Sequence, residues 1–139
     1  MTSLHNVKVQ YIRPHFNNLK EWCEYPDNCY IGRKGIVFIT DEFGNKERYP
    51  KHDSIWANPF KVSPTKYSLE ESLELYRAYI INKIKNENLN IEQLRHKKLG
   101  CWCVKSPIQF SHHIYMNECC HGQILMQLLH DNSGELFFV

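Results

Sequence analysis

The sequence predicts an α/β fold: a single small domain over residues 1–139, built as a mixed sheet with helices packed against it and an inserted β-hairpin. Three observations support this prediction. The 139 residues suit one domain that is large enough to bury a core. Short runs with β character alternate along the chain with segments of helical periodicity. A strand–helix–strand order in the C-terminal half is typical of sheets that carry helices on their faces.

The N-terminal half is predicted to contain mainly short strands. Alternating apolar residues, or short β-branched runs, mark four strand segments: residues 6–12, 29–33, 35–40 and 46–50. The last two segments flank a DEFGN turn sequence and therefore predict a hairpin. A loop with one helical turn at residues 19–22 is expected between the first two strands. Pro59 and Pro64 exclude a helix from the loop at residues 52–64.

The C-terminal half is predicted to contain the main helices. Ser68 and Glu71 have the spacing of a capping box, in which side chains satisfy free N–H groups of the first turn. Apolar residues then recur at helical spacing, so a helix is expected from residue 68 to about residue 86. The remaining expected elements are, in order, a short helix, a strand, a helix and a last strand: residues 91–97, 98–104, 120–131 and 134–139.

Composition and charge limit the kinds of partner and compartment. The net charge of +2 lacks the strong basic excess typical of nucleic-acid binders, so nucleic acid is not supported as a partner. No stretch is apolar enough to span a membrane, and the N-terminus lacks the apolar segment of a secretory signal. These features predict a cytoplasmic protein, or one in the host cytoplasm or virion if it is viral. In a reducing compartment the six cysteines are expected to be free or metal-bound.

Four of the six cysteines and three of the eight histidines lie in residues 100–122. Cys101 and Cys103 are one residue apart on an expected strand, so alternation sends both thiols to the same face. Cys120 and His121 lie at an expected helix start, where the helix dipole favours thiolate. Three thiolates and one imidazole suit tetrahedral zinc, so a zinc site at these four residues is one interpretation of the cluster. Two other interpretations stay open: a buried cluster of small core cysteines, and a redox or nucleophilic thiol.

A second group of residues predicts a ligand pocket. Arg33 follows a glycine at an expected strand end, where a guanidinium can clamp phosphate or carboxylate. Arg13 and Asn58 are expected beside it, together with His15. Tyr30 and Trp56 have rings that can stack on a base or sugar. The group therefore predicts a site for a nucleotide-like ligand, by analogy with nucleotide-binding α/β proteins.

A competing interpretation gives the same loop a packing role. In it, Trp56, Pro59 and Phe60 fix the loop to the core, and Arg33 pairs with an acidic residue such as Asp53. The segments YIGR and GCWC both end expected strands. We therefore expect them on neighbouring strands of one sheet, which would bring Arg33 and the cysteines to a shared edge.

Four segments, taken together, resemble a family of uncharacterised domains found in phages, bacteria and large DNA viruses: YIGR at residues 30–33, WANPF at residues 56–60, the helix at residues 71–80, and LGCWC with CHG at residues 99–103 and 120–122. The chain departs from the family pattern at four points. Residues 34–55 carry a hairpin where the family usually has a short loop. Ala57 replaces the usual glycine, and the link from Cys103 to Cys120 is long. Gln123 stands where the family often has aspartate, so an acid–base role at that position is unavailable here.

Two hypotheses about function follow. The favoured one is a non-catalytic homodimeric interaction module, in a family with viral members, that carries a Cys/His cluster. The apolar residues 136–139 are expected to complete a sheet within the chain or across the dimer. The alternative is a nucleotide-like-ligand binder, or an enzyme acting on N-glycosidic bonds, with Arg33, Asn58 and Cys101 around one pocket. Gln123 and the lack of a recognised catalytic triad favour the non-catalytic hypothesis.

Overall fold

The computed structural model describes residues 1–133, and it has the α/β architecture that the sequence predicts. Four strands form a mixed sheet and two more form a separate hairpin. The elements in chain order are β1 (Ser3–Asn6), α1 (Val9–Ile12), α2 (Leu19–Glu24), β2 (Asn28–Tyr30), β3 (Val37–Thr40), β4 (Lys46–Tyr49), α3 (Leu69–Asn86), the 3-10 helix η1 (Ile91–Leu94), β5 (Lys98–Cys101), β6 (Ile108–Gln109), the 3-10 helix η2 (His112–Tyr115) and α4 (His121–Ser133).

The main sheet has the strand order β2-β5-β1-β6. Strand β5 runs parallel to both β1 and β2, whereas β6 pairs antiparallel with β1. Tyr30 of β2 lies in register with Gly100 of β5, so the YIGR and GCWC segments are neighbours, as expected. The carboxyl ends of three parallel strands therefore meet at one edge of the sheet, which is where ligands bind in open α/β sheets.

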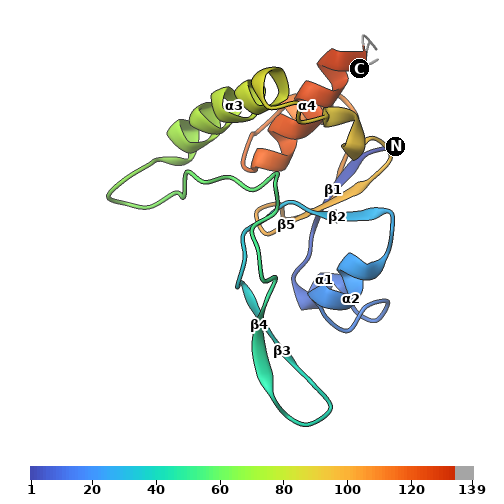
Figure 1. The fold of residues 1–139 in the computed structure, drawn as a ribbon. Helices are drawn as coiled ribbons and strands as arrows, with labels where there is room; N and C mark the ends of the chain where they lie inside the picture. The colour runs from blue at the N-terminus through green and yellow to red at the C-terminus, as the bar shows by residue number, and fades with distance from the viewer. Residues whose placement is uncertain (134–139) are drawn as a thin grey trace.

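Helices cover the sheet on both sides (Figure 1). The long helices α3 and α4 pack on one side, where Leu4 and Leu99 enter the larger core together with Tyr76 of α3 and Leu125 of α4. The short helices α1 and α2 lie on the other side, over a smaller cluster that contains Val7, Ile12, Leu19 and Trp22. Each face of the sheet therefore packs against its own hydrophobic cluster.

The β3–β4 hairpin forms its own two-stranded sheet and extends away from the rest of the molecule (Figure 1). Val37 and Tyr49, at its base, pack against the smaller core cluster. Directly beyond this base Phe38 is 60% exposed, and in the turn Phe43 is 81% exposed. The hairpin is therefore attached at its base and free along most of its length.

Three expected elements differ from the structure. The strand expected at residues 98–104 ends at Cys101, so Cys103 lies beyond it. The strand expected at residues 6–12 is wrong, because β1 ends at Asn6 and α1 begins at Val9. The Asn6 side chain causes this change: its Oδ1 accepts the Lys8 backbone N–H at 2.9 Å, which turns the chain. The helix expected at residues 91–97 is only the 3-10 turn η1. The strand expected at residues 134–139 lies outside the described residues.

The helix expected from residue 68 is confirmed. Its capping box is complete: the Ser68 hydroxyl accepts the Glu71 backbone N–H, and the Glu71 carboxylate accepts the Ser68 backbone N–H, both at 3.1 Å. Within residues 1–133, no helix combines the length and the apolar character needed to cross a membrane.

Candidate functional site

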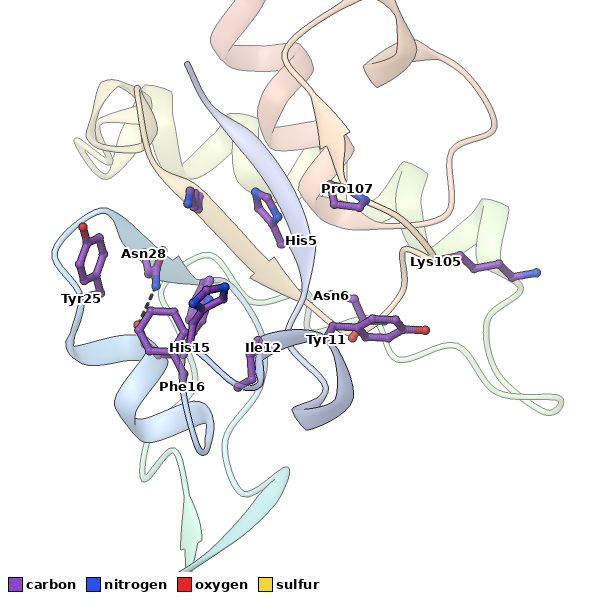
Figure 2. Close-up of a pocket in the computed structure, with 12 residues that line it drawn as sticks. His5, Asn6, Tyr11, Ile12, His15, Phe16, Tyr25, Asn28, Lys105 and Pro107 are labelled. Carbon is purple, nitrogen blue, oxygen red and sulfur yellow. Dashed lines mark hydrogen bonds between the residues drawn. The ribbon is translucent and has the colours of Figure 1, made fainter.

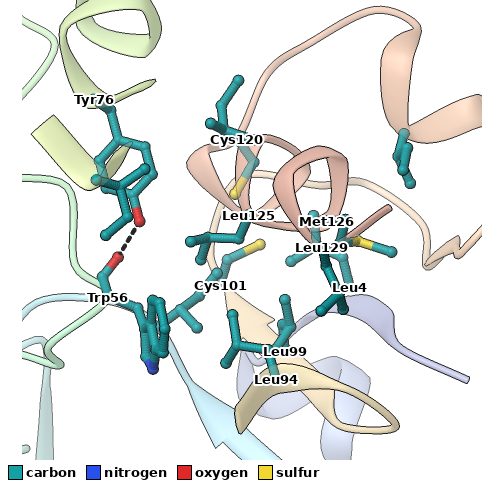
Figure 3. Packing of buried hydrophobic residues seen from close by; sticks show 14 of the residues in the cluster. Leu4, Trp56, Tyr76, Leu94, Leu99, Cys101, Cys120, Leu125, Met126 and Leu129 are labelled. Atoms are coloured by element: carbon teal, nitrogen blue, oxygen red, sulfur yellow. Dashed lines mark hydrogen bonds between the residues drawn. The ribbon is translucent and has the colours of Figure 1, made fainter. Parts of the chain in front are cut away.

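Three thiols meet where β5 ends and α4 begins. Cys101 is the last residue of β5, Cys103 follows two residues later, and Cys120 directly precedes α4. The Cys120 thiol lies near enough to the Cys101 and Cys103 thiols for each to shift the pKa of the other. Cys101 and Cys120 are buried, and their sulfurs point into the same part of the core (Figure 3), whereas Cys103 is exposed. The cluster therefore reaches from the core to the surface.

Gly122 allows the start of α4 to approach the sheet this closely. A Cβ atom at this position would lie 2.5 Å from a methyl group of Leu4 and 2.9 Å from one of Ile31. Only a residue without a side chain fits between the helix and the β1–β2 region without displacing them. The glycine of the CHG segment thus places Cys120 and His121 against the sheet.

Cys120 and Gln123 together cap α4. The Cys120 sulfur accepts the Gly122 backbone N–H at 3.4 Å. The Gln123 Oε1 accepts the backbone N–H groups of Cys119 and Cys120 at 2.8 and 3.2 Å, and its Nε2 donates to the Met116 carbonyl at 3.0 Å. The arrangement is like a capping box in which a thiol replaces the usual hydroxyl. Gln123 is fully buried and both ends of its amide are used, so its role here is structural.

His121 is held in one orientation by the backbone of the sheet. Its Nε2 lies 2.7 Å from the Ile31 carbonyl oxygen. A carbonyl only accepts, so Nε2 carries the proton and Nδ1, at 4.0 Å from the Cys120 sulfur, is bare. Burial lowers the pKa of His121 to about 4. The imidazole beside the thiols is therefore neutral at neutral pH.

The three thiols do not share their protons equally. Hydrogen bonding from Cys120 lowers the pKa of Cys103 to about 7, and the nearby charge of Arg33 contributes to the same shift. Hydrogen bonding from Cys120 also lowers the pKa of Cys101. The pKa of Cys120 is raised well above its usual value, because its proton stabilises the two neighbouring sulfurs and because it is buried. Near pH 7, Cys103 is partly thiolate while Cys120 keeps its proton.

Arg33 reaches this edge of the sheet and is held there by the WANPF loop. Its Nε donates to the Asn58 carbonyl at 2.9 Å. The buried Asn58 side chain in turn donates to the Ser72 hydroxyl of α3 and accepts the Phe60 backbone N–H. The Asp53 carboxylate accepts the Lys34 backbone N–H at 2.8 Å instead of pairing with Arg33. Asn58 thus positions the guanidinium.

The remaining residues expected in a ligand pocket occupy different places. Trp56 is buried, and its carbonyl accepts the Tyr76 hydroxyl at 2.6 Å, as the packing interpretation requires. The Tyr30 hydroxyl accepts from the Trp102 indole and donates to the Arg33 carbonyl, so Tyr30 supports the Arg33 turn. Arg13 donates to the Asn17 carbonyl within the α1–α2 loop. The structure thus brings Arg33, but not Arg13, to the thiols.

The zinc prediction for Cys101, Cys103, Cys120 and His121 gains no support from the described geometry. Over residues 1–133, no group of three or more His, Cys, Asp or Glu side chains has an arrangement that could hold a metal ion. The capping role of Gln123 and the carbonyl contact of His121 could not be read from the sequence. Both depend on loops that come together only in the folded chain.

Comparisons with known proteins give a family without an assigned role. The family model described as "Domain of unknown function (DUF4326)" matches residues 15–131. A similar protein is "Uncharacterized protein R718" of Acanthamoeba polyphaga mimivirus, which is 33% identical over 103 residues. That match covers 73% of this chain and 67% of the viral protein. No solved structure matches the chain.

Proposed function

The chain belongs to the family of domains of unknown function DUF4326, and from this premise we propose that it is a dithiol protein that carries out thiol–disulfide exchange. Cys103 is the attacking thiol and Cys120 the resolving thiol. The observation that carries the proposal is the proximity of one buried thiol, Cys120, to an exposed one, Cys103. An exposed thiol can reach a substrate, and a thiol in contact with it can complete the exchange.

The proposed reaction begins at the exposed sulfur. The Cys103 thiolate attacks one sulfur of a substrate disulfide, the substrate S–S bond breaks, and one substrate thiol leaves with a proton from solvent. Cys120 then loses its proton and attacks the Cys103 sulfur of the mixed disulfide. The second substrate thiol leaves and a Cys103–Cys120 disulfide forms. Two electrons pass from the protein to the substrate disulfide, which is the oxidant.

Arg33 and Cys120 have separate supporting roles in this proposal. Arg33, fixed by Asn58, places a positive charge near the Cys103 thiolate. Cys120 donates a hydrogen bond to the same sulfur until it is needed as a nucleophile. Cys101 also lies near Cys120 and competes for it as a disulfide partner. Its burial limits direct attack by a substrate on Cys101.

The test is equilibration of the intact protein with reduced and oxidised glutathione, followed by mass mapping of disulfides. We expect a Cys103–Cys120 disulfide in the wild type and in Cys101→Ser. Cys120→Ser should instead accumulate a mixed disulfide with glutathione at Cys103. Cys103→Ser should form neither the Cys103–Cys120 disulfide nor this mixed disulfide. Cys23→Ser is the matched control, because Cys23 lies on the other side of the sheet in the smaller cluster. Absence of the Cys103–Cys120 bond at every redox ratio would contradict the proposal.

Zinc binding by the same residues is the second candidate function. It is favoured by His121, whose Nε2 is bound to a carbonyl while Nδ1 faces the Cys120 sulfur, because metal-binding histidines are commonly oriented in this way. This candidate requires the side chains to rearrange around the ion. Elemental analysis of the protein purified without chelator separates the two candidates. One equivalent of zinc that blocks disulfide formation would replace the exchange proposal.

A further inference from the structure

A cavity of about 700 Å³ lies on the side of the sheet that faces α1 and α2. Its walls come from β1, β5, the α1–α2 region and the loop before β6 (Figure 2). We call it the α1–α2 cavity. The thiol cluster belongs to the larger core on the opposite side of the sheet. A cavity of this volume can enclose much of a small organic ligand.

The charged residues that line the α1–α2 cavity are all basic. Lys98 projects from β5 and Lys105 from the loop that follows it, and the imidazoles of His5 and His15 also line the cavity. Neither aspartate nor glutamate is among the lining residues. His5 is anchored by the Ser3 hydroxyl, which lies 2.7 Å from its Nε2. Such a cavity attracts an anion.

Aromatic rings form the other part of the wall. Phe16 and Tyr25 lie at one end, edge to face with their centroids 6.2 Å apart, and Tyr11 lies towards Lys105 at the other end (Figure 2). Tyr11 and Tyr25 are each 52% exposed, so their rings have free surface. A planar ring can stack on such side chains, and stacking on aromatic residues is how unpaired bases are commonly held.

We propose that the α1–α2 cavity binds a nucleoside phosphate, with its base against the aromatic rings and its phosphate paired with Lys105. The same unit occurs free, as a mononucleotide, and within single-stranded nucleic acid. The proposal is independent of the thiol chemistry, because it uses other residues on the other side of the sheet. It also differs from a nucleotide site at Arg33 and Asn58, which the WANPF loop occupies with packing contacts.

The test is isothermal titration calorimetry of the full chain with five probes: AMP, UMP, adenosine, inorganic phosphate and an eight-residue oligothymidylate. We expect AMP or UMP to bind at least about tenfold more tightly than adenosine or phosphate, because only the nucleotides supply both groups. Lys105→Glu and Tyr25→Ala should each weaken nucleotide binding by about tenfold or more. Lys85→Glu, an exposed residue of α3, is the matched charge control and should bind as the wild type does.

The oligonucleotide separates the two sources of the ligand. Tighter binding of oligothymidylate than of the mononucleotides, lost in Lys105→Glu, would identify single-stranded nucleic acid as the source. Equal or weaker binding would identify the free nucleotide. Circular dichroism of each variant checks that it is folded. The proposal would be overturned if AMP, UMP and oligothymidylate all fail to bind at millimolar concentration. It would also be overturned if Lys105→Glu and Lys85→Glu bind the nucleotides with equal affinity.

Discussion

Gly100 shows how one residue without a side chain fixes the contact between the sheet and α2. It lies in the middle of the main sheet, and a Cβ atom there would be 2.6 Å from the Trp22 ring and 2.7 Å from a methyl group of Val7. Glycine in a strand costs roughly 0.5–1 kcal/mol of conformational entropy. Overpacking a buried site against a rigid indole costs about 1–3 kcal/mol, so the steric effect is the larger one.

We therefore expect Gly100→Ala to lower the free energy of unfolding by about 1–2 kcal/mol, measured by urea denaturation. Val7→Ala removes one of the two obstructing groups. The cost of Gly100→Ala should consequently be smaller in a Val7→Ala background than in the wild type, which a double-mutant cycle measures. An unchanged or raised denaturation midpoint for Gly100→Ala alone would show that Trp22 moves aside at no cost.

At the candidate site, sequence patterns could predict proximity but not roles. The expected strand and helix start were enough to bring Cys101, Cys103 and Cys120 into one region, although β5 ends at Cys101, so strand alternation does not apply to Cys103. They could not show that Gln123 closes the helix end, because an amide in place of an acid suggests only a lost catalytic group. The described contacts show that this amide both accepts and donates, which a carboxylate cannot do.

At the scale of elements, patterns among residues close together in the chain predicted the helices and strands most accurately. Helix α3 followed from its capping box and periodicity, and the β3–β4 hairpin from its turn sequence, because both are determined by residues close together in the chain. The end of β1 was missed because one Asn6 side chain turns the backbone and also donates to the Val104 carbonyl at 2.9 Å. That second contact joins segments far apart in sequence, which periodicity cannot detect.

The contacts of Glu92, which join η1 to α4, predict that the stability of the protein depends on pH. Glu92 pairs with Arg95 at 2.5 Å and accepts a hydrogen bond from Asn132 of α4 at 2.8 Å. The Arg95 hydrogen bond is the main reason that the pKa of Glu92 is lowered from 4.5 to about 2. A carboxyl with a lowered pKa in the folded state stabilises the protein above the unfolded pKa. That contribution disappears as the pH falls from about 4.5 towards 2.

Glu92→Gln should accordingly lower the melting temperature at pH 7, and the difference from wild type should shrink as the pH falls below 4.5. Thermal unfolding followed by circular dichroism between pH 7 and pH 2 measures this. Glu42→Gln, in the exposed hairpin turn, is the control and should follow the wild type. A difference that stays constant down to pH 2 would show that the ion pair does not contribute.

At the scale of the whole molecule, the two sheets should tolerate change very differently. The hairpin pairs only with itself and is anchored by Val37 and Tyr49, whereas β1 lies between β5 and β6. Replacing residues 38–48 by a short glycine-rich turn should leave a cooperatively folding domain, measured by thermal unfolding. Removing residues 1–6 should abolish cooperative unfolding, because it splits the main sheet. Loss of folding in the hairpin variant would mean that the hairpin is part of the core.

The homodimer expected through residues 136–139 stays a prediction, since those residues lie outside the described part of the chain. The overall α/β class, by contrast, followed from element order alone. Strand order could not be predicted in the same way, because nothing in the local sequence shows that β1 lies between two strands from the other end of the chain.

The central place of β1 has a consequence for the protein while it is being made. Residues 3–6 pair with residues 98–101 and are flanked on the other side by residues 108–109. A ribosome adds roughly 5–20 residues per second, so β1 waits roughly 5–20 seconds for its neighbours. During that time both of its edges are open to other chains. The nascent chain therefore carries an unpaired strand until most of it has left the ribosome.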